Sequence, residues 1–282
     1  MDIREIRDRI DSIDNEMADL FEKRMQIVKE VADFKRERGI SVEDHDREKK
    51  IIEKHSTRIE DNRIRALYIN FQQEVMEISK RWQHMLLNGM SVACPGDAQS
   101  AAYKAAETIF PDSNIAVYEK CREAYKAVED GVCELAVLPL ENSYSGEVGK
   151  VYDLIFSGDL YVNDILSVEG KDSTTRYAII SRVESTPEEG NGCDAFLIMF
   201  TVRDEIGGLA KAINIISAYD FNMRVLRSRP LKDLQWHYYF YAELEGNCST
   251  KNAERLRRAL SAACPVVRIA GTISEKRDAA GR

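Results

Sequence analysis

The sequence predicts a multi-domain protein: an all-α domain that intertwines with a second copy, then one α/β lobe, then an α+β domain of ferredoxin-like order. Apolar residues before residue 90 recur every three to four positions, as in helices. Short apolar runs then alternate with helical stretches. After a segment of linker composition at 185–192, a β-α-β-β-α-β order follows. The predicted domains are therefore 1–90, 91–184 and 193–275.

The composition bounds the class of protein. With 282 residues and 44% hydrophobic content, the chain can bury the cores of two or three domains. A net charge of −8 argues against nucleic acid or an anionic membrane as a partner. No apolar run reaches membrane-spanning length, and the start MDIREIRDRID is too charged for a signal peptide, so we expect a cytoplasmic protein. The six cysteines lack metal-site spacing, so neither disulfides nor zinc are expected.

The first predicted helix, from Asp2 to about Glu37, is the stretch around which the chain is organised. Its apolar seam consists of Ile3, Ile6, Ile10, Ile13, Met17, Leu20, Ile27, Val31 and Phe34. The slot between Leu20 and Ile27 holds Arg24, and a guanidinium is costly to bury without an anion. The seam therefore predicts an anionic ligand, and its length without an internal cap predicts intertwined chains.

Two other cations of this helix bear on that ligand. Lys35 lies eleven positions beyond Arg24, so the two point within roughly 20° of each other, about 16 Å apart along the axis. Arg7 is turned away by about 100° and lies roughly 25 Å from Arg24, so it cannot serve the same ligand from the same helix but could serve a partner chain's ligand. The plainer interpretation is that Arg24 only sets the register of a coiled coil, Arg7 pairs with Asp11, and Lys35 is solvated.

Two further helices are predicted before residue 90. The first helix ends near Gly39, and SVEDHDREKKIIEKH begins the second, with Ser41 or Asp44 as N-cap. An apolar stripe marks the third helix at about 63–87, and Ser79 and Gln83 lie at the edge of that stripe. Taken alone, they would be ordinary polar neighbours of a core.

Eight residues of these helices resemble the active site of the all-helical class of chorismate mutase, over residues 1 to about 88. DHDRE is similar to the family's D-x-D-R-E, and the matching residues are Arg7, Arg24, Lys35, Asp44, Arg47, Glu48, Ser79 and Gln83. The resemblance implies conversion of chorismate to prephenate, a unimolecular rearrangement of a dicarboxylate. Such a reaction requires no nucleophile, metal or proton relay, so no cofactor is expected.

The resemblance also implies a role for each residue. Arg24 and the partner's Arg7 clamp the two carboxylates, for which a planar guanidinium is better suited than an ammonium. Lys35 and Gln83 donate to the ether oxygen, and Glu48 accepts from the ring hydroxyl. Three groups complete the pocket: Arg47, Ser79 and the backbone of Asp44.

The segment 91–184 predicts an α/β lobe with a parallel sheet. Strands are expected at 91–94, 114–118, 134–140, 160–166 and 176–180, and helices at 98–110, 122–131 and 148–157. Two motifs stand out in it, PLENSYSGEVGKVYDLI and TTRY. Through them the lobe resembles the first lobe of prephenate dehydratase, and the matching residues are Glu141, Asn142, Ser143, Thr175 and Arg176.

Two departures separate the lobe from that family. The family's opening G-P-x-G-[ST]-[FY]-S loop stands here as CPGDAQS, without the second glycine, the hydroxyl after it and the aromatic residue. Only 169–175 separates Val168 from Arg176, where the family inserts a whole second lobe. Because the dehydratase site lies between two lobes, we expect this activity to be lost and the matching residues to be structural remnants. The competing idea is that a dimer partner supplies the second wall.

The segment 194–274 predicts strands at 195–202, 222–228, 237–244 and 265–273, and helices at 207–218 and 251–263. This order, with three local motifs, resembles the ACT regulatory domain. The matching residues are Gly207, Gly208, Leu209, Asn222, Ser228 and Arg229. Gly208 and Arg227 stand where the family usually has Ala and Glu. The resemblance implies phenylalanine as effector, and the alternative is a sheet that only dimerises.

We therefore expect a homodimeric chorismate mutase of phenylalanine biosynthesis, with a truncated dehydratase-like lobe and an ACT domain that senses phenylalanine. The first alternative is a bifunctional mutase and dehydratase that forms phenylpyruvate. The second is a non-catalytic amino-acid sensor, in which the mutase fold serves only to dimerise the chain. The full set of mutase residues favours catalysis.

Overall fold

The computed structural model describes residues 2–170, 172–184, 195–231 and 237–273. The chain divides into two compact units, 1–90 and 91–282. The linker predicted at 185–192 lies outside the described residues. In the described part of the chain, no helix is long and apolar enough to cross a membrane.

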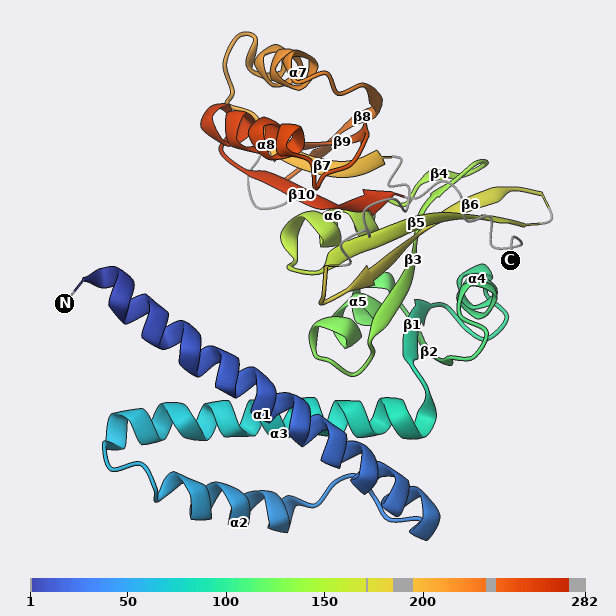
Figure 1. The fold of residues 1–282 in the computed structure, drawn as a ribbon. Helices are drawn as coiled ribbons and strands as arrows, with labels where there is room; N and C mark the ends of the chain where they lie inside the picture. The colour runs from blue at the N-terminus through green and yellow to red at the C-terminus, as the bar shows by residue number, and fades with distance from the viewer. Residues whose placement is uncertain (1, 171, 185–194, 232–236, 274–282) are drawn as a thin grey trace. The chain divides into compact units, whose positions relative to one another are not determined.

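The first unit consists of three helices, α1 (Ile3–Arg38), α2 (His45–Ser56) and α3 (Asn62–Asn88), drawn in blue to cyan in Figure 1. Asp2 caps α1 in a capping box with Glu5, and Gly39 ends the helix with φ 63°, a left-handed conformation that favours glycine. Asp44, rather than Ser41, caps α2 by accepting from the Arg47 backbone N–H at 3.0 Å. All three predicted helices are confirmed.

The apolar seam of α1 is exposed within this single chain. The side of α1 that packs on α3 buries Val28 and Ala32, neither of which belongs to the predicted seam. The seam residues Leu20 and Ile27 remain 64% and 60% exposed, and most of their neighbours along the seam are similarly uncovered. A row of exposed apolar side chains this long is typical of an interaction surface.

The second unit is built on one ten-stranded sheet with the order β2-β1-β3-β6-β5-β10-β7-β9-β8, with β4 paired to β3. Its strands are β1 (Ser91–Pro95), β2 (Asn114–Tyr118), β3 (Leu135–Asn142), β4 (Gly146–Glu147), β5 (Tyr161–Glu169), β6 (Thr174–Ser181), β7 (Ala195–Thr201), β8 (Met223–Pro230), β9 (Tyr238–Glu245) and β10 (Val267–Ile273). Its helices are α4 (Ala101–Ile109), α5 (Cys121–Glu129), α6 (Gly149–Ser157), α7 (Gly208–Ala218) and α8 (Lys251–Ala263). The predicted elements are present, and β4 is an addition.

The expected parallel sheet is only partly correct. β1 pairs in parallel with β2 and β3, but β6 runs antiparallel to both β3 and β5. The reason is the connection between β5 and β6, which spans only residues 170–173 and is closed by the Gly170 N–H donating to the Ser173 carbonyl at 2.8 Å. A connection this short makes a hairpin, whereas parallel strands need a crossover of a dozen or more residues.

A single close approach joins the sheet of the lobe to the strands of the predicted third domain. β10 pairs in parallel with β5 where Gly271 faces Val162. A Cβ atom at residue 271 would overlap the Val162 carbonyl group, so only glycine lets the two backbones come this close. Residues 91–282 thus form one compact unit, and the boundary between the predicted second and third domains stays a prediction.

β7 is covered on both of its faces, and all seven of its residues are buried. Phe196, Ile198 and Phe200 share a core with α7 and α8. Leu197 and Met199, which point the other way, share a core with α5 and α6 of the lobe. In Figure 1 the orange and red helices lie on one side of these strands and α6 on the other. The two-sided burial explains the unbroken apolar run AFLIMF.

Candidate functional site

The first unit brings Arg24 of α1 against Ser79 of α3. The Arg24 guanidinium donates to the Ser79 hydroxyl and to the Val75 carbonyl oxygen, the latter at 3.4 Å. Burial lowers the pKa of Arg24, and no carboxylate in the described part of the chain forms an ion pair with it. A half-buried guanidinium without a counter-anion is the charge that the sequence predicted at this position.

Two further residues of the predicted site retain hydrogen-bonding capacity. Gln83 is 7% exposed, and its amide nitrogen donates to the Ser79 carbonyl at 3.3 Å. Its amide oxygen is buried without a partner among the described residues. Lys35 donates one bond to the Val42 carbonyl at 2.7 Å, which leaves two of the three ammonium hydrogens for a ligand. Polar groups held in this way are suited to bind a small polar molecule.

Glu48 of α2 faces Lys80 of α3, a residue that sequence reasoning missed. Lys80 Nζ lies 3.3 Å from Glu48 Oε1 and 2.5 Å from Glu77 Oε1. The kind of signal that identified Arg24, a cation at an apolar stripe of a helix, could also have found Lys80. Beside this pair is a hollow of about 480 Å³, lined by His45, Glu48, Lys49, Ile52, Gln73, Met76 and Glu77.

The remaining predicted mutase residues are not part of this cluster. The Asp44 side chain caps α2, and the side chain of Arg47 is exposed. Arg7 is also exposed, and it lies about five turns of α1 before Arg24. The single chain therefore brings together Arg24, Ser79 and Gln83, and it leaves Arg7 far from them.

In the second unit, the five predicted dehydratase residues lie together at the carboxyl end of β3, the edge of an α/β sheet where ligands usually bind. The pairing of β3 with β6 places Asn142 opposite Thr175 and Glu141 opposite Arg176. The Asn142 amide donates to the Thr175 hydroxyl at 2.8 Å, and the Ser143 hydroxyl accepts from the Thr174 N–H at 3.0 Å. The structure thus brings the residues of the two sequence motifs together.

The charged members of this cluster are paired with strands from the far end of the chain. Arg176 lies 2.9 Å from Glu243 of β9 and 3.6 Å from Glu141. Although burial disfavours the charge, hydrogen bonds with Glu243 raise the pKa of Arg176. Arg227 of β8 also binds Glu141, at 2.7 Å. Both charged residues of the cluster are therefore engaged within the protein.

A second arginine of β8 extends this network along α6. Arg229 binds Asp153 through Nε at 2.8 Å and Glu147 through Nη1 at 2.7 Å. The Tyr239 hydroxyl donates to Asp153 at 2.9 Å, and the Tyr241 hydroxyl donates to Glu147 at 2.7 Å. Residues two apart on a strand share a face. The arginines at 227 and 229 in β8 and the tyrosines at 239 and 241 in β9 have this spacing, which was the signal that could have predicted the network.

The predicted effector residues are divided by this arrangement. Arg229 points to the lobe, and a Cβ at residue 149 of α6 would overlap its guanidinium, so a larger residue there would require the Arg229 side chain to move. Gly207, Gly208 and Leu209 lie at the start of α7, whereas Asn222 follows the end of that helix. The single chain therefore does not gather the whole predicted set at one place.

Arg229→Met is expected to destabilise the second unit by about 2 kcal/mol, because it removes the arginine that binds Asp153 and one of the two arginines that bind the partly buried Glu147. The control is Arg227→Met, whose side chain is 40% exposed against 23% for Arg229, and which should cost less than about 1 kcal/mol. Urea unfolding of both variants measures the difference. Equal losses would show that the network does not depend on the more buried arginine.

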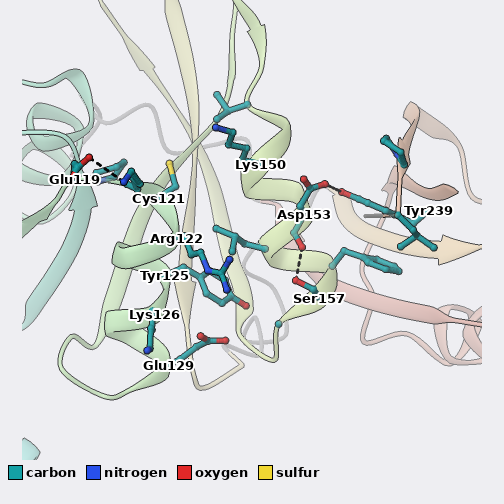
Figure 2. Close-up of a pocket in the computed structure, with 18 residues that line it drawn as sticks. Glu119, Cys121, Arg122, Tyr125, Lys126, Glu129, Lys150, Asp153, Ser157 and Tyr239 are labelled. Atoms are coloured by element: carbon teal, nitrogen blue, oxygen red, sulfur yellow. Dashed lines mark hydrogen bonds and ion pairs between the residues drawn. The ribbon is translucent and has the colours of Figure 1, made fainter. Parts of the chain in front are cut away.

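A cavity of about 1080 Å³ lies beside this network, between α5, α6 and the facing ends of β8 and β9. Figure 2 shows Arg122 and Lys126 on the side of α5, and Asp153 and Tyr239 on the other. The rings of Phe156 and Tyr239 stack with centroids 4.2 Å apart and form an apolar wall. In the described ranges neither Arg122 nor Lys126 forms an ion pair, and the lining also carries the carboxylates of Glu119, Glu129 and Asp153, so the cavity holds charges of both signs beside an apolar wall.

Comparison with known proteins connects both units to families. Residues 6–84 match the family model for chorismate mutase type II. Residues 92–205 match the family model for prephenate dehydratase. The chain therefore matches these two family models in succession, in the order that the resemblances in the sequence implied.

Relatives combine the same two domains. A bifunctional chorismate mutase/prephenate dehydratase from Aquifex aeolicus (strain VF5) is 32% identical over 129 residues, 45% of this chain and 33% of that protein. The bifunctional enzyme from Escherichia coli (strain K12) is 28% identical over 217 residues, 68% of this chain and 55% of that protein. The chain thus spans between a third and about half of the length of these relatives.

A solved structure shares the fold of the larger part of the chain. It is a prephenate dehydratase from Arthrobacter aurescens in complex with L-Phe, with a TM-score of 0.59 and 15% sequence identity. The likeness covers 66% of this chain and 90% of that one. At this identity it shows the fold alone.

Proposed function

We propose that the protein is a chorismate mutase that converts chorismate to prephenate in the biosynthesis of phenylalanine. The observation that carries the proposal is the half-buried Arg24, which has no carboxylate partner among the described residues and lies beside Ser79 and Gln83. The match of residues 6–84 to chorismate mutase type II supports the same reaction. Two carboxylates on the substrate would supply the anions that this site lacks.

The chemistry explains why such a site suffices. The rearrangement is unimolecular, so the protein must hold a compact conformer of the substrate and stabilise the charge that develops on the breaking ether oxygen. Arg24 binds one carboxylate through its planar fork. Lys35 and the Gln83 amide donate to the ether oxygen, and Glu48 accepts from the ring hydroxyl. Arg47, Ser79 and the Asp44 backbone complete the pocket.

The proposal includes a homodimer in which the partner's Arg7 completes the pocket. Two observations support it: Arg7 lies too far along α1 to reach the ligand of its own chain, and the apolar seam of α1 is exposed. Pairing of two seams would bury this row and would bring the N-terminal half of one α1 to the site of the other chain.

We further propose that the dehydratase activity is lost because the second lobe of the family is missing. The four-residue connection between β5 and β6 supports this, since it leaves no room for a lobe at that point. The engagement of Glu141 and Arg176 by Arg227 and Glu243 also supports it, because both charged residues would have to leave their partners to bind a substrate.

Regulation by phenylalanine is the third part of the proposal. The β-α-β-β-α-β order of β7–β10 supports an ACT domain, and a protein of similar fold was solved in complex with L-Phe. The residues proposed to bind it are Gly207, Gly208, Leu209, Asn222, Ser228 and Arg229. Since Arg229 is bound to Asp153 and Glu147, binding through Arg229 would require this contact to open.

Chorismate consumption and product identity, measured with and without phenylalanine, test these proposals. We expect prephenate as the end product and a rate that responds to phenylalanine. Phenylpyruvate above background would refute the loss of dehydratase activity and support a bifunctional enzyme. No consumption of chorismate would refute the mutase proposal and leave the non-catalytic sensor.

A further inference from the structure

Lys80 of α3 holds Glu48 of α2 across the contact between the two helices. Lys80 neither caps α2 nor belongs to the apolar stripe of α3. Lys80 Nζ lies 3.3 Å from Glu48 Oε1 and 3.5 Å from Glu48 Oε2, so the ammonium bridges both carboxylate oxygens. The Lys80 side chain is 15% exposed and that of Glu48 is 25% exposed. An ion pair buried to this degree is stronger than one on the open surface.

The position of Lys80 is held in turn by Glu77, which lies one turn earlier on α3. The Lys80–Glu77 distance is 2.5 Å. Although burial disfavours the charged form, the bonds with Glu77 and Glu48 raise the pKa of Lys80, so the ammonium stays charged at neutral pH. The charge is thus fixed by one carboxylate of its own helix, and it faces another carboxylate across the helix–helix contact.

We infer that Lys80 is a positioning residue for Glu48. The inference rests on the proposed function, in which Glu48 accepts a hydrogen bond from the ring hydroxyl of the substrate. A free carboxylate side chain samples several rotamers, whereas an ammonium between the helices restricts Glu48 to the one that faces Lys80. In this inference Lys80 acts on the reaction through Glu48, which it binds, and not through a contact of its own with the substrate.

Four proteins test this dependence: the wild type, Lys80→Met, Glu48→Gln and the double variant. We expect kcat/KM for chorismate to fall about 10-fold in Lys80→Met and about 100-fold in Glu48→Gln. The double variant should be no worse than Glu48→Gln alone, because Lys80 has no other route to the reaction. Lys80→Arg, which keeps a cation opposite Glu48, should stay within about 3-fold of the wild type.

The matched control is Arg81→Met, which removes the neighbouring cation of α3. Arg81 binds Glu74 at 2.9 Å and not Glu48. It should leave kcat/KM unchanged, and circular dichroism should show all variants folded. Additive losses in the double variant, or full activity in Lys80→Met, would overturn the inference while the wild type still consumes chorismate. A wild type that does not consume chorismate would instead refute the proposed function.

Discussion

Arg24→Ala is expected to lower kcat/KM for chorismate by about 1000-fold, the largest loss of any single substitution in the helical unit. Arg24 is a half-buried cation whose charge faces no carboxylate within the described structure, so the substrate's anion is proposed to be its partner. Arg24→Lys keeps the charge without the bidentate fork and should lie between alanine and the wild type. Steady-state kinetics with chorismate measure both.

Lys23→Ala is the control for this substitution, because it removes the adjacent and exposed cation of the same helix. It should retain activity within about 2-fold, since exposed charges contribute little. An Arg24→Ala protein that is folded and retains most of its activity would show that the guanidinium serves only the contact of α1 with α3.

The Arg24→Ala variant also tests which chain supplies Arg7 to the site. Arg7→Ala and Arg24→Ala proteins, each inactive alone, should regain activity when they are mixed, unfolded and refolded together. A heterodimer would hold one pocket with both arginines intact, so random pairing predicts about a quarter of the wild-type activity. Refolded mixtures without any recovery would place the action of Arg7 in its own chain or exclude it from the reaction.

Gly271→Val is expected to destabilise the second unit by about 3 kcal/mol or more, because its side chain would overlap the Val162 backbone where β10 pairs with β5. A loss of that size lowers the melting temperature of a unit of this length by roughly 6–12 °C. Calorimetry measures the shift, and hydrogen exchange should show faster exchange in β5 and β10 than in β1–β3. Gly271→Ala should have a smaller effect of the same sign.

The control is Thr272→Val, one position further along β10. It removes the hydrogen bond from the Thr272 hydroxyl to the Asn163 carbonyl, 3.1 Å long, and adds no bulk against β5. Its expected cost is about 1 kcal/mol. If Gly271→Val were no worse than this, the close approach of β5 and β10 would not hold the two halves of the sheet together.

Local signals in the sequence determined most of the helical unit. Gly39 identified the end of α1, and Asp44 was one of the two candidates for the cap of α2, because such residues satisfy backbone groups within one turn. Arg24 could be recognised from the sequence as well, because it interrupts the apolar period of α1. Such an interruption can be seen without knowing which residues pack against the helix. The strand at β7 was likewise predicted from its apolar run, although its burial on both faces was not.

Only the tertiary structure decided which distant groups meet. Lys80 and Glu48 come from different helices, and Arg229 reaches Asp153 across 76 positions of the chain. The antiparallel direction of β6 and the junction at Gly271 were not predicted either. The physical reason is the range of the forces involved. Helix caps and apolar periods act within a few residues, whereas ion pairs and strand neighbours are selected by the packing of whole elements, which no local pattern records.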